Sequence, residues 1–97
     1  MSPAFSVRTT PRFDRLARSL RKQHPGAFSD QLEAALAILG ENPHNRSGRH
    51  PIRKLQGIAE GEGQYRLRLG RWRFRYDILA DQVVLHYAGL RREDTYR

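Results

Sequence analysis

The chain has 97 residues, of which 38% are hydrophobic and 29% charged, fractions typical of one ordinary globular domain over residues 1–97. Lys and Arg number 18 against 10 Asp and Glu, and the net charge of +8 favours a nucleic-acid or acidic-protein partner. Cysteine is absent, which excludes disulfides, thiolate nucleophiles and zinc–thiolate sites.

The first part of the chain predicts a short strand followed by a helix. Residues 5–9 alternate apolar and polar side chains, as a half-buried strand does. Thr10 offers an N-cap and Pro11 the first helical position, after which apolar residues recur at helical spacing. We therefore expect a helix over Pro11–Gln23.

A second helix is predicted after a break at Pro25-Gly26. Ser29 is a suitable N-cap and Asp30 a suitable first residue, because a carboxylate is favourable at a helix N-terminus. Gly40 is a natural C′ residue, since glycine readily adopts the conformation that ends helices. The two helices are expected to form a helical hairpin.

The pattern is irregular between the second helix and the C-terminal part of the chain. Residues 44–51 are polar and rich in turn formers, which indicates a loop. We expect residues 52–57 to form a short extended or turn segment, and residues 59–63 to be a connector that contains Gly and Glu.

The segment Gln64–Ile78 predicts a β-hairpin, because apolar and basic residues alternate on both sides of Gly70-Arg71. A two-residue type II′ turn needs positive φ at its first central position, which Gly70 supplies. The predicted pairs are Leu69 with Trp72, Arg68 with Arg73, Leu67 with Phe74 and Arg66 with Arg75. The apolar face comprises Tyr65, Leu67, Leu69, Trp72, Phe74, Tyr76 and Ile78.

The other face of the predicted hairpin carries four arginines, with Asp77 at its end. Like charges directly opposite each other destabilise an antiparallel pair, so a sheet that needed only solubility would mix the signs. The alternative is a solvated strand face that is merely rich in arginine. The convergence favours a surface that binds a polyanion, formed by Arg66, Arg68, Arg73 and Arg75.

A last strand is predicted over residues 83–90. In the simplest register, His86 lies near Asp77 on the arginine face. Gly89 is expected to mark a bulge or a sharp strand end that redirects the arginines after it. The same register places Leu85 and Tyr87 on the apolar face, and Val84 and Ala88 beside His86.

The order strand, helix, helix and three consecutive strands predicts an α+β fold. The expected architecture is an antiparallel twisted sheet, made of the N-terminal strand and a three-strand C-terminal meander. The two-helix hairpin would pack on its apolar face, which leaves the arginine face open to a ligand.

Several common types of site are missing from the sequence. There is no Gly-rich phosphate loop and no nucleophile elbow, and the four histidines lack metal-ligand spacing, so we expect no metal or cofactor. There is also no apolar signal segment and no run of membrane-spanning length, which predicts a cytoplasmic protein without a membrane partner. Metal-free RNA cleavage remains open, because arginines can hold the phosphate and RNA supplies its own 2′-hydroxyl nucleophile.

The element order and three stretches of the sequence resemble the RelE/ParE superfamily of toxins from bacterial toxin–antitoxin pairs. The resemblance implies a RelE/ParE-like fold and a cognate antitoxin as partner. The stretches are Lys54-Leu55-x-Gly57, then Tyr65-Arg66-Leu67-Arg68-Leu69-Gly70-x-x-Arg73-Phe74-x-Tyr76-Asp77-Ile78, and Val83-Val84-Leu85 to Gly89-x-Arg91-Arg92 with a closing Tyr96-Arg97.

For RelE-type members the resemblance implies a ribosome-dependent mRNA endonuclease. Arg66 and Arg68 then correspond to the basic strand residues, Arg73 to the phosphate-stabilising arginine, and Arg91 and Tyr96 to the C-terminal arginine and tyrosine. The residues expected to bind RNA are Lys54, Arg66, Arg68 and Arg75, and the expected catalytic residues are Arg73, Arg91, Tyr96 and His86.

The proton carrier is open between Tyr96 and His86, because an arginine cannot readily give up its proton near neutral pH. His86 is alternatively a strand histidine merely paired with Asp77. ParE-type members share the scaffold but inhibit DNA gyrase, so a gyrase inhibitor without nuclease activity is the alternative function.

Overall fold

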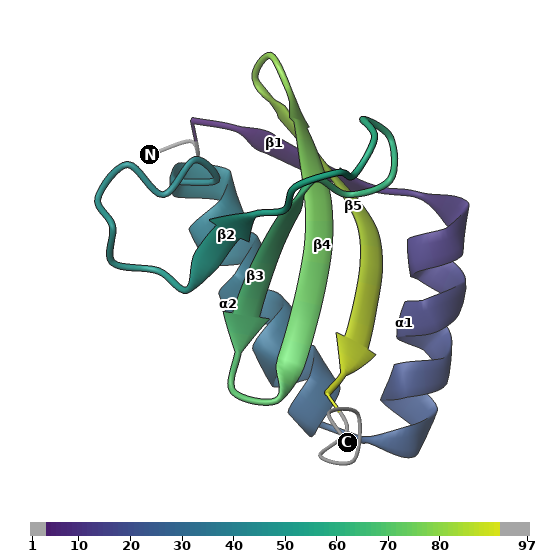
Figure 1. The fold of residues 1–97 in the computed structure, drawn as a ribbon. Helices are drawn as coiled ribbons and strands as arrows, with labels where there is room; N and C mark the ends of the chain where they lie inside the picture. The colour runs from purple at the N-terminus through teal and green to yellow at the C-terminus, as the bar shows by residue number, and fades with distance from the viewer. Residues whose placement is uncertain (1–3, 92–97) are drawn as a thin grey trace, which may run out of the picture.

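The computed structural model describes residues 4–91, which form two helices and one five-stranded sheet (Figure 1). The elements are β1 (Ser6–Thr9), α1 (Pro11–Gln23), α2 (Ala27–Glu41), β2 (Ile52–Lys54), β3 (Tyr65–Leu69), β4 (Trp72–Leu79) and β5 (Gln82–Leu90). The strands lie in the order β1-β5-β4-β3-β2. Both helices contribute to one core on one side of this sheet, so the predicted α+β architecture is confirmed.

The sheet is mixed. Strands β3, β4 and β5 form the antiparallel meander that the sequence predicts. β2, for which the sequence predicts only a short extended or turn segment, adds a strand antiparallel to β3. β1 instead pairs in parallel with β5, with Ser6 opposite Gln82 and Thr9 opposite Leu85. The alternation of residues 5–9 identifies a strand but not its partner, and a parallel pair needs a long connection such as the chain between β1 and β5.

α1 has the predicted bounds because its first turn is capped as expected. Thr10 Oγ1 accepts a hydrogen bond from the Phe13 N–H at 3.1 Å, and Pro11 occupies the first helical position. Phe13 and Ala17 are buried against the sheet, whereas the arginines of this helix are exposed. Neither helix within residues 4–91 is long and apolar enough to cross a membrane.

α2 is longer at both ends than the sequence predicts. It begins at Ala27 after Gly26, whose φ is 80°, and the predicted cap at Ser29 is wrong. The reason is Phe28, which is fully buried and packs 5.4 Å from the Trp72 ring, so core packing draws the first turn into the helix. Gly40 lies inside the helix rather than beyond it.

The core is a single cluster between the helices and the sheet. α2 passes behind β3 and β4 in Figure 1, and α1 runs alongside β5. Tyr76 is fully buried in this core, and its hydroxyl donates to the Pro43 carbonyl oxygen at 2.7 Å. This burial, with Tyr65 stacked alongside, raises the pKa of the Tyr76 phenol well above its usual range.

Candidate nucleic-acid interface

Strands β3 and β4 form the predicted hairpin in the predicted register. Arg66 pairs with Arg75 and Arg68 with Arg73, so the four arginines share the sheet face that points away from the helices. Gly70 has a φ of 60°, and the turn therefore uses the positive φ that glycine adopts without steric cost.

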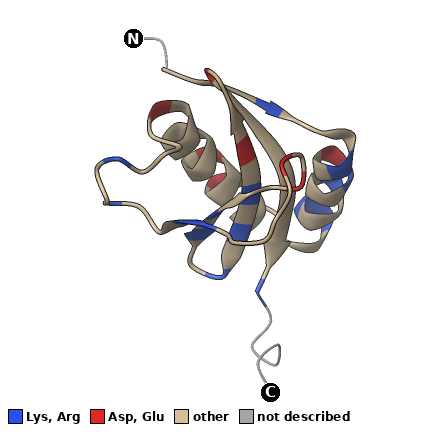
Figure 2. Cartoon of the chain, turned by 45° about the horizontal axis from the view of Figure 1, so that its top comes forward, with Lys and Arg blue, Asp and Glu red and all other residues tan. Residues whose placement is uncertain are grey.

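β2 adds an arginine that the sequence pattern does not single out. Arg53 pairs with Arg66, so these two share one row across the sheet with Arg75. Lys54 pairs with Tyr65, so its side chain lies on the opposite face of the sheet from Arg53, with its Nζ 5.7 Å from the centre of the Tyr65 ring. Figure 2 shows lysines and arginines gathered on β2, β3 and β4. A strand of three residues is too short for its sequence pattern to show which side chains share a face.

A groove of about 560 Å³ lies on this face, and we call it the arginine groove. It brings together four arginines that the sequence predicts as site residues, Arg66, Arg73, Arg75 and Arg91. Arg68 is exposed on β3 and lies outside the lining. The residues that line the arginine groove are Leu55, Arg66, Arg73, Arg75, Tyr87, Gly89, Leu90 and Arg91.

Backbone carbonyl groups hold the Arg75 side chain and the main chain at Arg91. Arg75 donates from Nε and Nη2 to the Gly63 carbonyl oxygen, at 3.2 and 3.1 Å. The Arg91 N–H donates to the Arg71 carbonyl oxygen at 2.6 Å, which fixes the chain just after β5. Contacts of this kind reduce the side-chain and backbone entropy lost when an anion binds.

The β4–β5 pairing contains a bulge. Arg75 pairs with Tyr87, whereas Tyr76 pairs with Leu85, so His86 is an extra residue in the ladder. Because side chains alternate with period 2, one extra residue moves all later side chains of β5 to the opposite face.

The bulge puts Tyr87 on the arginine face and Ala88 into the core, where Ala88 is 1% exposed and pairs with Phe74. The predicted position of Tyr87 on the apolar face, with Ala88 on the other, is therefore wrong. The sequence pattern also predicts an irregularity at Gly89, whereas the structure has the bulge at His86 and Gly89 in regular pairing.

Asp77 is buried and holds the connector between β2 and β3 over one end of the sheet. Its Oδ2 accepts hydrogen bonds from the N–H groups of Gly61 at 2.8 Å and Gly63 at 3.2 Å, and its Oδ1 accepts one from Gln64 at 2.8 Å. His86 Nε2 lies 2.8 Å from Asp77 Oδ2, which confirms the predicted proximity of this pair. The connector therefore covers part of the face that the sequence predicts to be open.

Of the two predicted proton carriers, only His86 belongs to residues 4–91, and it is not among the residues that line the arginine groove. His86 lines a separate pocket with Thr9, Thr10 and Glu60, beyond the bulge. Tyr96 lies outside the described residues. Within residues 4–91, no group of three or more His, Asp or Glu side chains is placed to hold a metal ion.

No protein-family model and no curated protein sequence matches this chain. Solved structures do match it. YafQ from E. coli strain BL21(DE3) is similar with a TM-score of 0.66 at 14% sequence identity, over 89% of this chain and 92% of YafQ. The E. coli DinJ–YafQ toxin–antitoxin complex gives a TM-score of 0.68 at 14% identity, over 90% of this chain and 92% of the matched chain.

The archaeal RelE–RelB complex from Pyrococcus horikoshii OT3 is similar with a TM-score of 0.63 at 24% identity, over 93% of this chain and 98% of the matched chain. The protein therefore has the α+β fold of the RelE and YafQ structures. The resemblance to RelE/ParE toxins that the sequence motifs indicate is confirmed at the level of the fold.

Proposed function

We propose that the protein is the toxin of a type II toxin–antitoxin pair and that it cuts mRNA on the ribosome. The observation that carries this proposal is the convergence of Arg66, Arg73, Arg75 and Arg91 on one groove of a RelE-like fold. Opposed arginines across β3 and β4 cost stability, and an anionic ligand offsets that cost.

The proposed reaction uses RNA's own 2′-hydroxyl as the nucleophile. Arg73 lies on β4 in the middle of the face and is the proposed clamp for the scissile phosphate, whose charge grows in the transition state. Arg91 would stabilise the same phosphate from the end of β5. Arg66 and Arg75 would hold the flanking backbone, and Arg68 would bind RNA at the rim. Lys54, which lies against the Tyr65 ring on the opposite face, is not part of this proposed RNA contact.

Tyr96 remains the proposed proton carrier. His86 has its Nε2 engaged by Asp77 and lies outside the arginine groove. A histidine in this position fixes the bulge of β5, so we propose a positioning role for His86 in place of proton transfer.

A cognate antitoxin is the proposed protein partner, because the E. coli and Pyrococcus structures above are toxin–antitoxin or RelE–RelB complexes. The net charge of +8 suits an acidic binding segment. The test is co-expression with the product of the adjacent gene: a stable complex that restores growth supports the partner, and unrelieved toxicity with no complex contradicts it. Gyrase inhibition draws no support from these neighbours.

Primer extension of mRNA in a cell-free translation reaction tests the nuclease proposal. We expect new 5′ ends with the wild-type protein, and their loss with Arg73→Ala. Arg15→Ala is the matched control, because Arg15 is an exposed arginine on α1, remote from β4 in sequence and on the helix layer. Equal cleavage by Arg73→Ala and Arg15→Ala would overturn the assignment of Arg73.

A further inference from the structure

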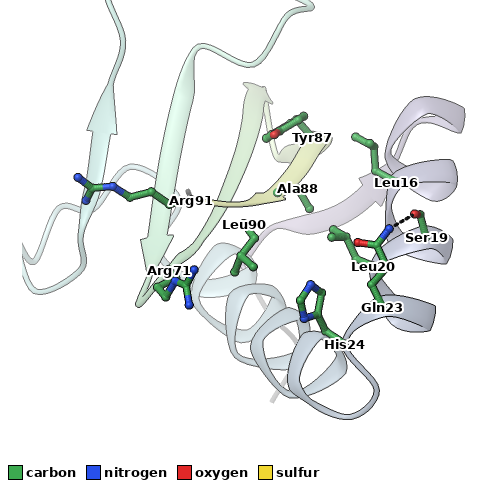
Figure 3. A pocket seen from close by; sticks show the side chains of 11 residues that line it. Leu16, Ser19, Leu20, Gln23, His24, Arg71, Tyr87, Ala88, Leu90 and Arg91 are labelled. Carbon is green, nitrogen blue, oxygen red and sulfur yellow. Dashed lines mark hydrogen bonds between the residues drawn. The ribbon is translucent and has the colours of Figure 1, made fainter. Parts of the chain in front are cut away.

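Tyr87 lies between two grooves of the protein. It lines the arginine groove, and it also lines a second groove of about 400 Å³ between β5 and α1. Figure 3 shows Tyr87 on β5 across the second groove from Leu16 and Leu20 of α1, with its hydroxyl pointing away from that helix and Arg91 extending away from the helix as well. The side chain is half-buried, so its ring is part of the wall and not a free surface group.

The orientation of Tyr87 is held from two sides. The Arg12 guanidinium of α1 lies 5.5 Å from the centre of the ring, at cation–π distance. The ring runs along β5 over Gly89, where a Cβ would lie 2.7 Å from Cζ, 2.9 Å from Cε2 and in collision with the hydroxyl. The hydroxyl thus occupies space that any residue other than glycine would fill.

Gly89 places this hydroxyl beside the proposed phosphate clamp, because Gly89 is the residue of β5 that pairs with Arg73. Neighbouring strands of a sheet lie about 4.8 Å apart, so a group above Gly89 is within reach of a phosphate held over Arg73. A phenolic hydroxyl is a neutral hydrogen-bond donor that complements the guanidinium groups around it.

We propose that the Tyr87 hydroxyl donates a hydrogen bond to a non-bridging oxygen of the phosphate that Arg73 holds, and is thereby a catalytic residue. This inference rests on the proposed RNA cleavage. The donor acts on charge that develops in the transition state, so it affects the rate of cleavage more than the binding of the ribosome complex. The bulge at His86, stabilised by Asp77, is what brings Tyr87 to this position.

The test is single-turnover cleavage of mRNA on programmed ribosomes by Tyr87→Phe. This change keeps the ring, its contact with Arg12 and the packing over Gly89, so the melting temperature should not change. We expect the cleavage rate to fall roughly 100-fold, the loss typical of one removed transition-state donor, with the ribosome concentration for half-maximal rate unchanged. Tyr65→Phe is the matched control, because Tyr65 is stacked on Tyr76 on the helix side of the sheet.

The possible outcomes distinguish the role of Tyr87 from the proposed nuclease activity itself. If the wild-type protein cleaves mRNA and Tyr87→Phe cleaves it at the same rate, the proposed role of Tyr87 is overturned and the nuclease proposal stands. Absence of cleavage by the wild-type protein would overturn the nuclease proposal and this inference with it. Gly89→Ala should displace the hydroxyl and reduce cleavage like Tyr87→Phe; full activity in that variant would refute the proposed orientation.

Discussion

Replacing Asp77 with asparagine removes a negative charge from the carboxylate that joins the connector, β4 and the bulge of β5. The carboxylate is 1% exposed and accepts hydrogen bonds from three backbone N–H groups and from His86. If the asparagine oxygen takes the place of Oδ2, its amide group must face the N–H of Gln64, which then has no acceptor there.

The size of the effect follows from these contacts. A hydrogen bond to a charged group contributes about 1.5–3 kcal/mol. Asp77→Asn loses the bond from Gln64 and weakens the bonds from Gly61, Gly63 and His86, so we expect its free energy of unfolding to fall by about 3 kcal/mol. For a domain of this length, such a loss corresponds to a fall in melting temperature of roughly 15 °C. The connector and the bulge would both loosen, and we expect lower RNA cleavage as a second consequence.

Urea denaturation at neutral pH measures this loss, with Asp81→Asn as the control. Asp81 is exposed in the β4–β5 turn, so its replacement should change the free energy of unfolding by at most about 0.5 kcal/mol. If Asp77→Asn were as stable as Asp81→Asn, the hydrogen bonds of the buried Asp77 carboxylate would not stabilise the connector and the bulge as we infer.

Three further predictions concern other parts of the protein. Tyr76→Phe removes the hydrogen bond to the Pro43 carbonyl oxygen, so its free energy of unfolding at pH 7 should be about 1 kcal/mol lower than that of the wild-type protein. The pKa of Tyr76 is higher in the folded protein than in the unfolded chain, so above pH 10 this phenol ionises in the unfolded chain first. The free energy of unfolding of the wild-type protein therefore falls by up to about 1.4 kcal/mol per pH unit above pH 10. The deficit of Tyr76→Phe in urea denaturation should therefore shrink by pH 11, and a constant deficit would contradict the burial argument. Gly63→Ala should melt lower than Gly61→Ala: both glycines have positive φ and bind Asp77, but only the Cβ at 63 would meet Arg75, at 2.9 Å. Equal melting temperatures would show that this close approach relaxes freely. Arg73→Ala should reduce the salt slope of single-stranded RNA binding by about 0.7, measured by fluorescence polarisation. An unchanged slope would mean that Arg73 does not contact phosphate.

The hairpin was predictable because its signals are local. Strict alternation sets which residues share a face, and a single glycine at position 70 sets the turn and thus the register. The same reasoning places α1 correctly from Thr10 and Pro11. These elements contain the arginines of β3 and β4, so most of the arginine face is visible in the sequence.

The bulge was not predictable from alternation, since the pattern of β5 fits an unbroken strand equally well. The contact that favours the bulge joins His86 to Asp77, and it becomes visible only when β4 and β5 are paired in space. Gly89 is the available signal, because glycine inside a strand marks either a bulge or a close approach. The structure has the close approach, by the ring of Tyr87.

The start of α2 and the partner of β1 depend on tertiary packing. Ser29 has good capping chemistry, but the burial of Phe28 outweighs it and extends the helix toward Gly26. β1 pairs with a strand about 75 residues later in the chain, and no local pattern encodes that distance.

The most direct test of the proposed function is whether mRNA cleavage requires ribosomes. Primer extension should be run on the same mRNA with the protein, in a complete translation reaction and in one from which ribosomes are omitted. We predict new mRNA 5′ ends in the complete reaction only. Intact mRNA in both reactions, together with gyrase-dependent DNA breaks in a parallel assay, would contradict the nuclease account and leave the arginine face as a binding surface alone.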